Sequence, residues 1–327
     1  MQEKRNIQIE IQQAVNILRE GGLVAFPTET VYGLGADAKN PEALAKIFSA
    51  KKRPKDHPLI VHLADRQQLK DWVREIPSVA EQLADAFWPG PLTLIFKKNA
   101  QVSDKITGGQ NTIGIRFPHH PIAVALLQQF GSGLAAPSAN RFGRISPTTA
   151  DAVHEELDAA VDMILDGGQC DVGVESTIVD VSNGTPVILR PGMISKTAIE
   201  AVLKQMLGEP LQHIPRVSGS HQSHYAPMTL TQLIETKQIP SFVEKIDAND
   251  LPMAFLLVKT KLLPREGIDY IAMSTDPLLY AHDLYFIMRE LDKKHYKKII
   301  IESVPINSEW DGIRDRLKRA SRGFVGI

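Results

Sequence analysis

The chain has 327 residues, of which 43% are hydrophobic and 23% are charged; these values are typical of a soluble globular protein of about two domains. The formal net charge of −1 excludes a global basic field that would recruit nucleic acid or an anionic membrane, so any site for a polyanion has to be local. The single cysteine, Cys170, excludes an internal disulfide framework and fits a reducing compartment.

The N-terminus is charged and leads into an amphipathic helix rather than into an apolar signal segment. No apolar run in the sequence approaches the roughly 20 residues that cross a bilayer. We therefore expect a cytoplasmic protein that makes no membrane contact.

Strands and helices are predicted to alternate over residues 1–208. The first helix covers 9–20 and stops at Gly21 and Gly22, and a short buried strand follows at 23–26. Later helices are predicted at 41–53, 66–73, 77–87, 121–130, 148–158 and 195–207, and later strands at 59–63, 91–96, 112–117, 134–137, 161–165, 176–181 and 186–189. Because some strands follow each other without an intervening helix, we expect an α/β fold with a mixed sheet.

The composition changes at 208–228, where Pro, Gly, Ser and His interrupt the apolar periodicity. Strands at 253–258, 270–273 and 298–302 then alternate with helices at 277–294 and 309–321. We predict a large domain at 1–208, a linker or lid segment at 209–228, and a smaller α/β domain at 229–327.

Cations cluster between a predicted helix and a predicted strand, in the stretch from Lys51 to Pro58 that also holds Arg53 and His57. Cations at the C-terminal end of a helix complement its macrodipole, which accounts for one or two of them. The cluster, however, continues to the apolar strand at 59–63. Cations beside a strand that enters the core indicate an anion site, with phosphate as the first candidate.

Polar side chains also follow the first strand. Thr28, Glu29 and Thr30 come directly after it, and Gly33 and Gly35 allow a ligand to approach the backbone closely. Ligands of open α/β sheets bind outside the carboxyl ends of strands, which makes this segment a candidate site. The alternative is a turn closed by a Ser/Thr-type hydrogen bond.

Two further segments carry polar groups on or beside strands. Arg116 shares a strand face with Thr112 and needs a partner there, either a structural carboxylate or a bound one. Ser138 and Asn140 follow a strand end, but no G-x-S-x-G elbow surrounds Ser138, so we do not interpret it as a hydrolase nucleophile. The histidines and the cysteine lack partners at zinc spacing, and no metal site is predicted.

These segments, in this order, closely resemble the YrdC-like family of threonylcarbamoyl-AMP synthases in its long, two-domain form. The matching motifs are Lys51-x-Arg53, Ser138-x-Asn140, PTETVYGLG at 27–35, FWPGPLTLI at 87–95, TIGIRFP at 112–118, ESTIVD at 175–180, LRPG at 189–192 and SGSHQSHYAP at 218–227. The resemblance implies a YrdC-like catalytic domain, built on a twisted mixed sheet with flanking helices, and a smaller Rossmann-like C-terminal α/β domain.

The resemblance also implies a reaction in which L-threonine, bicarbonate and ATP give threonylcarbamoyl-AMP and pyrophosphate. A separate transferase complex would then move the threonylcarbamoyl group to adenosine 37 of tRNAs that read ANN codons. Mg²⁺ would arrive with the ATP rather than in a protein cage.

Matching positions carry the family's site residues. Catalytic roles fall on Lys51, Arg53, Ser138 and Asn140. L-Threonine would be held by Thr30, His62, Arg116, Ala136 and Ser176. ATP would contact Arg53, His57, Thr112, Ser138, Ser146, Arg190 and Tyr225. Tyr225 would fold over the site from the linker as part of a lid that keeps water from the intermediates.

Other interpretations stay open from the residues alone. A YrdC-like fold could serve as a double-stranded RNA-binding module, although the net charge of −1 favours at most weak RNA contacts. The scaffold could also belong to another carbamoyl- or adenylyl-transfer enzyme with a different amine substrate, or to a regulatory protein that keeps only the fold.

Overall fold

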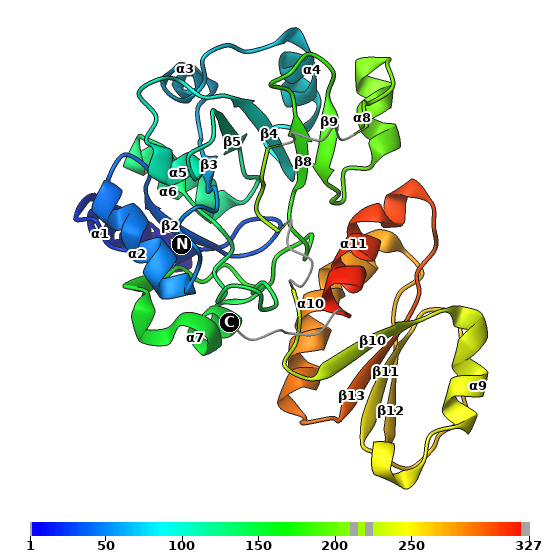
Figure 1. Ribbon diagram of the computed structural model, residues 1–327. Helices are drawn as coiled ribbons and strands as arrows, with labels where there is room; N and C mark the ends of the chain where they lie inside the picture. Colours follow the sequence, from blue (N-terminus) through cyan, green and yellow to red (C-terminus); the bar gives the residue numbers. More distant parts are fainter. Residues whose placement is uncertain (1, 210–214, 220–224, 322–327) are drawn as a thin grey trace.

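Two β-sheets, one large and one small, organise the chain (Figure 1). The structure is a computed structural model and describes residues 2–209, 215–219 and 225–321. The large sheet belongs to the N-terminal domain and the small sheet to the C-terminal domain.

The large sheet is mixed, as the sequence predicts. Its strand order is β7-β1-β2-β6-β3-β5-β4-β8-β9. The strands are β1 (Val24–Phe26), β2 (Gly33–Asp37), β3 (Ile60–His62), β4 (Leu92–Lys97), β5 (Thr112–Arg116), β6 (Leu134–Ala135), β7 (Met163–Ile164), β8 (Thr177–Asp180) and β9 (Val187–Arg190). The pairs β1–β7, β3–β5 and β4–β8 are parallel, and the other neighbours are antiparallel.

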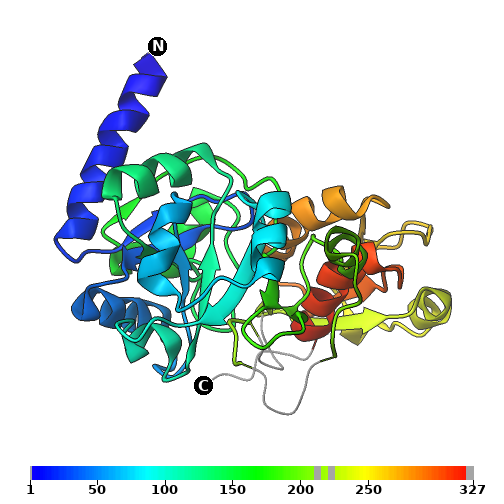
Figure 2. The same ribbon diagram turned by 90° about the horizontal axis from the view of Figure 1, so that it is seen from above.

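Helices cover both faces of this sheet. They are α1 (Gln2–Arg19), α2 (Pro41–Lys51), α3 (Leu69–Trp72), α4 (Ser78–Phe87), α5 (Asp104–Thr107), α6 (Pro121–Phe130), α7 (Ala150–Leu157) and α8 (Lys196–Leu203). Val24 and Phe26 pack with α1 and α6, whereas Ala25 faces the core that includes α2, α4 and α8, because side chains alternate along a strand. The N-terminal part of α1 projects from the domain (Figure 2).

The small sheet is entirely parallel, in the order β10-β13-β11-β12. Its elements are β10 (Leu230–Ile234), α9 (Ile239–Glu244), β11 (Met253–Leu257), β12 (Ile268–Ala272), α10 (Pro277–Lys293), β13 (Lys298–Glu302) and α11 (Asp311–Ala320). Phe255 packs on the side of α9, and its neighbours Ala254 and Leu256 pack on the side of α10 and α11. This unit is the Rossmann-like domain expected from the sequence.

The sequence does not predict β2, β10, α5 or α9, and α5 falls in a stretch, 98–111, that is expected to be a loop. The β2 segment, Gly33–Asp37, holds two glycines, which are depleted in strands, and was interpreted only as a ligand loop. It is nevertheless a strand because it pairs with β1 and β6 on its two sides. Tertiary pairing therefore overrides local propensity at this position.

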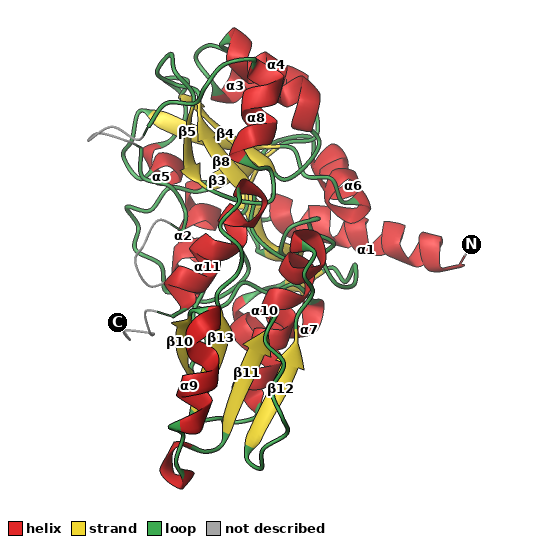
Figure 3. Cartoon of the chain, turned by 90° about the vertical axis from the view of Figure 1, so that its right-hand side faces the viewer, coloured by secondary structure: helices red, strands yellow, loops and turns green. Residues whose placement is uncertain are grey.

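Helices α10 and α11 lie between the two sheets (Figures 1 and 3). Their apolar cluster includes Leu284 and Ile313 and also Val31, Ile145 and Val174 from the N-terminal domain. One buried core thus crosses the domain boundary, so the two domains are packed together rather than loosely tethered.

Gly312→Ala should destabilise this interface, although a glycine-to-alanine change inside a helix is ordinarily stabilising by about 1 kcal/mol. The added Cβ would lie 2.6 Å from the carbonyl oxygen of Gly192, so the backbones of the two domains would have to separate. We expect a lower Tm in thermal unfolding followed by circular dichroism. Lys318→Ala, on the exposed face of α11, should leave the Tm nearly unchanged. A Gly312→Ala protein that melts at or above the wild-type Tm would contradict this packing.

Candidate functional site

The predicted site residues converge on a small cavity where strands of the large sheet end. His62 and Arg116 are the last residues of the parallel strands β3 and β5, and Arg190 is the last residue of β9. The cavity has a volume of about 40 Å³. The predicted residues that line it are Arg53, His62, Arg116, Ala136, Ser138, Ser176, Arg190 and Tyr225. It lies at strand ends, where ligands bind in open α/β sheets.

A buried ion pair ties Arg116 to the loop after β1. The Arg116 guanidinium lies 2.9 Å from Glu29 Oε1, and both side chains are 6% exposed. Glu29 Oε2 accepts a hydrogen bond from the backbone N–H of His119 at 2.9 Å. Glu29 is therefore the structural carboxylate that a buried arginine requires. Arg116 Nε has no hydrogen-bond partner in the described part of the chain, which leaves one side of the guanidinium available to a ligand.

Thr28 closes the turn that carries Thr30. Its hydroxyl donates to the Val31 carbonyl oxygen at 2.7 Å and lies 2.9 Å from the Thr30 hydroxyl. The Ser/Thr-type turn considered from the sequence is thus present. Thr28 and Val31 line the cavity, whereas Thr30 stands behind them.

Lys51 and Arg53 make different contacts. Helix α2 ends at Lys51, two residues earlier than predicted, because Lys52 adopts a left-handed conformation with φ of 50°. Lys51 is 1% exposed, and its side-chain nitrogen donates to the carbonyl oxygens of Ser138 and Asn140. Arg53 instead lines the cavity. Lys51 therefore holds the Ser138–Asn140 segment, and Arg53 faces the ligand space.

Asn140 holds the loop that follows Ser138. Its amide nitrogen donates to the carbonyl oxygens of Arg141 at 2.7 Å and Arg144 at 2.9 Å, and the Asn140 side chain is itself buried. The Asn140 amide and the Lys51 ammonium thus satisfy buried carbonyl oxygens of this loop and hold Ser138 in the cavity wall.

Arg190 and Ser176 form another part of the wall. Arg190 donates to the Ser176 carbonyl oxygen through Nε at 3.1 Å and through a terminal nitrogen at 2.9 Å. The same terminal nitrogen lies 3.1 Å from Ser176 Oγ, which is also 2.8 Å from the Thr93 hydroxyl. The bidentate contact fixes the guanidinium plane at the start of β8.

The cavity carries excess positive charge. Arg53 and Arg190 are 7% and 4% exposed, and neither forms an ion pair with a carboxylate among the described residues. Burial lowers the pKa of Arg53 to about 10, which leaves it charged at neutral pH. Buried cations without counter-ions are costly, so the site favours an anionic ligand.

His62 is neutral in this environment. Burial, and then the charge of Arg116, lower its pKa to about 3. Its Nδ1 has no hydrogen-bond partner within the described ranges. A neutral imidazole with a free nitrogen can hydrogen-bond an amine or a hydroxyl of a ligand.

Lys51 lies in a similar environment. Burial, and then the charge of Arg53, lower its pKa below the usual value of a lysine.

Three further predicted residues do not line the cavity. Ser146 stands behind it, where its hydroxyl donates to Glu175. His57 packs its ring against Phe142, with the centroids 5.2 Å apart. Thr112 begins β5 at the strand end remote from Arg116 and lines a separate hollow of about 1190 Å³.

Linker residues close the cavity. Arg53 donates to Ser218 Oγ at 3.1 Å, and Arg190 donates to the Ser218 carbonyl oxygen at 3.0 Å. Gly219 and the buried Tyr225 also line the space. A volume of about 40 Å³ holds roughly one water molecule, so a larger ligand requires these residues to move. Residues 220–224 of the predicted lid lie outside the described residues.

Sequence reasoning assigned no role to Glu175 or to the C-terminal residue that holds it. Glu175 lines the cavity and lies 2.7 Å from Arg316 of α11. A signal for Arg316 exists in the sequence, because it shares the apolar face formed by Ile313, Leu317 and Ala320. Because a cation on a buried helix face needs a partner, this pattern could have identified Arg316 as a member of a buried ion pair.

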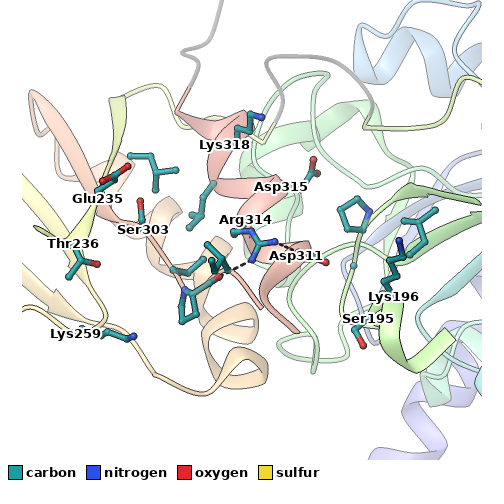
Figure 4. Close-up of a pocket in the computed structure, with 18 of the residues that line it drawn as sticks. Ser195, Lys196, Glu235, Thr236, Lys259, Ser303, Asp311, Arg314, Asp315 and Lys318 are labelled. Carbon is teal, nitrogen blue, oxygen red and sulfur yellow. Dashed lines mark hydrogen bonds and ion pairs between the residues drawn. The ribbon is translucent and has the colours of Figure 1, made fainter. Parts of the chain in front are cut away.

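A larger cavity, of about 980 Å³, lies between the two domains (Figure 4). Its walls come from β9, α8, α11 and the ends of β10 and β13, and the Asp311–Arg314 ion pair borders it. None of the described residues that line it is a predicted site residue. Arg53 Nε, His62 Nδ1 and Arg116 Nε, which have no hydrogen-bond partner among the described residues, belong instead to residues that line the smaller cavity, so the smaller cavity is the candidate site.

In the described ranges, no group of three His, Cys, Asp or Glu side chains could hold a metal ion. No helix among the described residues is both long enough and apolar enough to cross a membrane.

Fold and site together define an α/β protein with a closed cationic site and a second α/β domain packed against it. A family model described as "Telomere recombination", for the Sua5, YciO and YrdC proteins, matches residues 16–192. A second model, described as "Threonylcarbamoyl-AMP synthase, C-terminal domain", matches residues 194–322.

Relatives match over nearly the whole chain. The threonylcarbamoyl-AMP synthase of Bacillus subtilis is 39% identical over 325 residues, which cover 97% of this chain and 94% of that protein. The synthase of Pyrococcus abyssi is 36% identical over 323 residues, covering 95% and 94%. The crystal structure of P. abyssi Sua5 complexed with L-threonine matches with a TM-score of 0.87 and 35% identity, over 95% of this chain and 94% of that one. The chain therefore belongs to the YrdC-like threonylcarbamoyl-AMP synthase family, and the resemblance seen in its motifs is confirmed.

Glu29→Gln should lower the free energy of unfolding by about 3 kcal/mol, because it leaves the Arg116 charge buried without its partner. Urea unfolding followed by fluorescence measures this loss. Asp71→Asn is the matched control, because it breaks an exposed ion pair. The Lys39 side chain of that pair is 57% exposed and the Asp71 side chain is 48% exposed. We expect that control to change the free energy by less than about 0.5 kcal/mol. Equal losses in the two variants would show that Arg116 does not depend on Glu29.

Proposed function

We propose that the chain is an L-threonylcarbamoyl-AMP synthase, which forms threonylcarbamoyl-AMP and pyrophosphate from L-threonine, bicarbonate and ATP. The observation that carries the proposal is the buried cationic cavity, where, within the part of the chain that the structure describes, Arg53 and Arg190 have no carboxylate partner and Arg116 Nε has no hydrogen-bond partner. All three substrates bring anionic groups, which these side chains would neutralise. The names of the family model and the relatives support the same reaction.

L-Threonine would lie beside Arg116, which would pair with its carboxylate through the nitrogen that Glu29 leaves free. The neutral His62 would face the amino group, and Ser176 and the backbone of Ala136 would complete the contacts from the wall. Thr30 would act from behind through the Thr28 hydroxyl. The L-threonine complex of the similar P. abyssi protein supports L-threonine as a ligand.

The nucleotide would lie against Arg53 and Arg190, with Ser138 as a hydrogen-bonding group in the wall. Thr112 begins β5, the strand that ends at Arg116. A nucleotide that reaches both ends of the site would therefore extend along β5 toward Thr112. The remaining predicted ATP contacts, from His57, Ser146 and Tyr225, would border this path.

The reaction needs two steps. The threonine amine adds to the carbon of bicarbonate with loss of water, which gives an N-carboxylate. An oxygen of that carboxylate then bonds to the α-phosphorus of ATP, while the bond from the α-phosphorus to the bridging oxygen breaks and pyrophosphate leaves. Both reactants of the second step are anions, so Arg53, Arg190 and Arg116 would act by neutralising charge and by positioning.

The linker would have to open for substrates and close over the intermediate. Ser218 and Tyr225 close the cavity in this structure, and Arg53 and Arg190 both donate to Ser218. A nucleotide would replace these two contacts with its phosphates.

We also propose the domain limits 1–208, 209–228 and 229–327, because α8 ends at Leu203 and β10 begins at Leu230.

Mg²⁺ would enter with ATP. The carboxylate that lines the cavity, Glu175, is already bonded to Ser146, Tyr285 and Arg316, so the phosphates rather than the protein would supply most ligands. The product is a mixed anhydride, and a tRNA threonylcarbamoyl transferase complex would consume it to modify adenosine 37 of tRNAs that read ANN codons.

RNA binding as the main function finds less support. A duplex RNA is recognised largely through its phosphates and 2′-hydroxyls, which requires exposed cations. The cations at this site are buried: Lys51, Arg53, Arg116 and Arg190 are 1%, 7%, 5% and 4% exposed. They are therefore suited to a small enclosed anion, and RNA would make only weak contacts elsewhere.

Arg53→Ala should lower the rate of threonine- and bicarbonate-dependent pyrophosphate release by at least about 100-fold, because it removes a charge that stabilises the phosphates in the transition state. A coupled pyrophosphate assay measures the rate with each substrate omitted in turn. Lys55→Ala, an exposed cation of the same cluster, should keep nearly full activity. Pyrophosphate release that ignores threonine and bicarbonate would reject the proposed reaction, and a fully active Arg53→Ala would remove Arg53 from the phosphate site.

A further inference from the structure

Helix α11 of the C-terminal domain presents a buried arginine to the catalytic domain. Arg316 is 1% exposed. Its Nε lies 2.7 Å from Glu175 Oε2, and its terminal nitrogens donate to the carbonyl oxygens of Glu175 at 3.2 Å and Pro191 at 2.9 Å. These three acceptors belong to the catalytic domain, and Asp315 of the same helix holds the guanidinium from behind at 2.9 Å.

Glu175 is the carboxylate that lines the candidate active site. Its Oε1 accepts from the Ser146 hydroxyl, and its Oε2 accepts from the Tyr285 hydroxyl at 3.1 Å as well as from Arg316. Two of these three donors, Tyr285 and Arg316, come from the C-terminal domain. The Glu175 side chain, next to Ser176 in the cavity wall, is thus oriented mainly by the C-terminal domain.

Arg316 also touches two other pieces of the wall. Pro191, whose carbonyl it binds, directly follows Arg190. The Arg316 guanidinium carbon lies 5.0 Å from the centroid of the Tyr225 ring, within the range of a cation–π contact. Tyr225 in turn stacks on Tyr285, with centroids 5.9 Å apart. One side chain therefore links the β8 entry, the end of β9 and the linker.

Domain association alone does not explain this arrangement. The apolar cluster that crosses the boundary already joins the two domains. A buried ion pair is often no more stabilising than apolar residues of the same volume. An arginine in addition fixes the positions of its partners, because the several donors of its planar guanidinium bind several acceptors at once.

We propose that Arg316 is a positioning residue for the synthase reaction, through which the C-terminal domain fixes Glu175, Ser176 and Arg190 in the geometry that binds threonine and ATP. This inference rests on the proposed function. It gives the C-terminal domain a task inside the active site: it pre-organises the wall before the substrates arrive.

The test compares Arg316→Met, Arg316→Lys and Tyr285→Phe with the control Arg314→Met in the full chain. Arg314 lies in the same helix, but it binds Pro305, Asn307 and Asp311 of its own domain. Pyrophosphate release gives kcat and KM for threonine and for ATP, and thermal unfolding gives the Tm. We expect kcat/KM to fall by about 100-fold in Arg316→Met, as for a misplaced active-site group.

Arg316→Lys and Tyr285→Phe keep the inference testable if Arg316→Met does not fold. Arg316→Lys keeps the positive charge but lacks the planar set of donors of the guanidinium. Compared with Arg316→Met, it should therefore recover the Tm of the wild type but not its kcat/KM. Arg314→Met should stay within a factor of about three of the wild type, because Arg314 does not line the small cavity of the candidate active site. A folded Arg316→Lys with the kinetics of Arg314→Met would overturn the inference. A wild-type chain without threonine-dependent activity would instead defeat the proposed function, and this inference with it.

The pH profile supplies a readout that a purely structural role would not change. Burial raises the pKa of Glu175, but Arg316 and Arg190 outweigh burial and leave the pKa below its usual value. The titratable or charged groups that face Glu175 are Arg316, Tyr285, Arg190, Tyr225 and Lys51, and Ser146 adds a hydrogen bond.

Removal of Arg316 takes away the largest of the causes that lower the pKa of Glu175, so its carboxyl should bind a proton at a higher pH than in the wild type. The acid limb of kcat/KM should therefore move to higher pH in Arg316→Met and stay in place in Arg314→Met. An acid limb that does not move in an active Arg316→Met would contradict the positioning of Glu175 by Arg316.

Discussion

The need to compensate buried arginines governs this structure. Arg116 is balanced by Glu29 and Arg316 by Glu175, and both pairs are almost fully buried. Arg53 and Arg190 have only neutral oxygens as partners among the described residues. A charge that is buried this far is costly unless a counter-ion binds beside it. The fold therefore contains an anion site before any ligand binds. The paired arginines set the geometry of the wall, and the unpaired ones are left for the ligand.

The same principle connects the two domains. The interface buries an apolar cluster around α10 and α11, which supplies most of the association energy. Polar contacts are spread over this boundary, and they include the ion pairs Arg289–Glu156, Lys293–Glu155 and Arg144–Asp292. Two further C-terminal side chains, Arg316 and Tyr285, reach Glu175 at the cavity. The C-terminal domain therefore takes part in shaping the active site, and the linker that joins the domains crosses the cavity mouth at Ser218.

Much of the site could be predicted from the sequence because its residues lie at strand ends. Arg116, Ser138 and Arg190 follow or end apolar strands, and that pattern alone indicates a crevice. β2 could not be predicted in this way, since its glycines disfavour a strand and only pairing with β1 and β6 forms it. The contact between Lys51 and the Ser138 loop, and that between Arg316 and Glu175, join residues 87 and 141 positions apart. Local periodicity contains no information on contacts over such separations.

The chemistry needs a site that closes, because an N-carboxylate and a mixed anhydride both react with water. Ser218 and Tyr225 already close the cavity, and the same residues closing over a bound intermediate would keep solvent away. The most direct test is mass spectrometry of the products that the purified chain forms from ATP, L-threonine and ¹³C-labelled bicarbonate. We expect threonylcarbamoyl-AMP that carries one ¹³C atom, together with pyrophosphate in equal amount. Formation of AMP and pyrophosphate without a labelled threonine adduct would contradict this expectation.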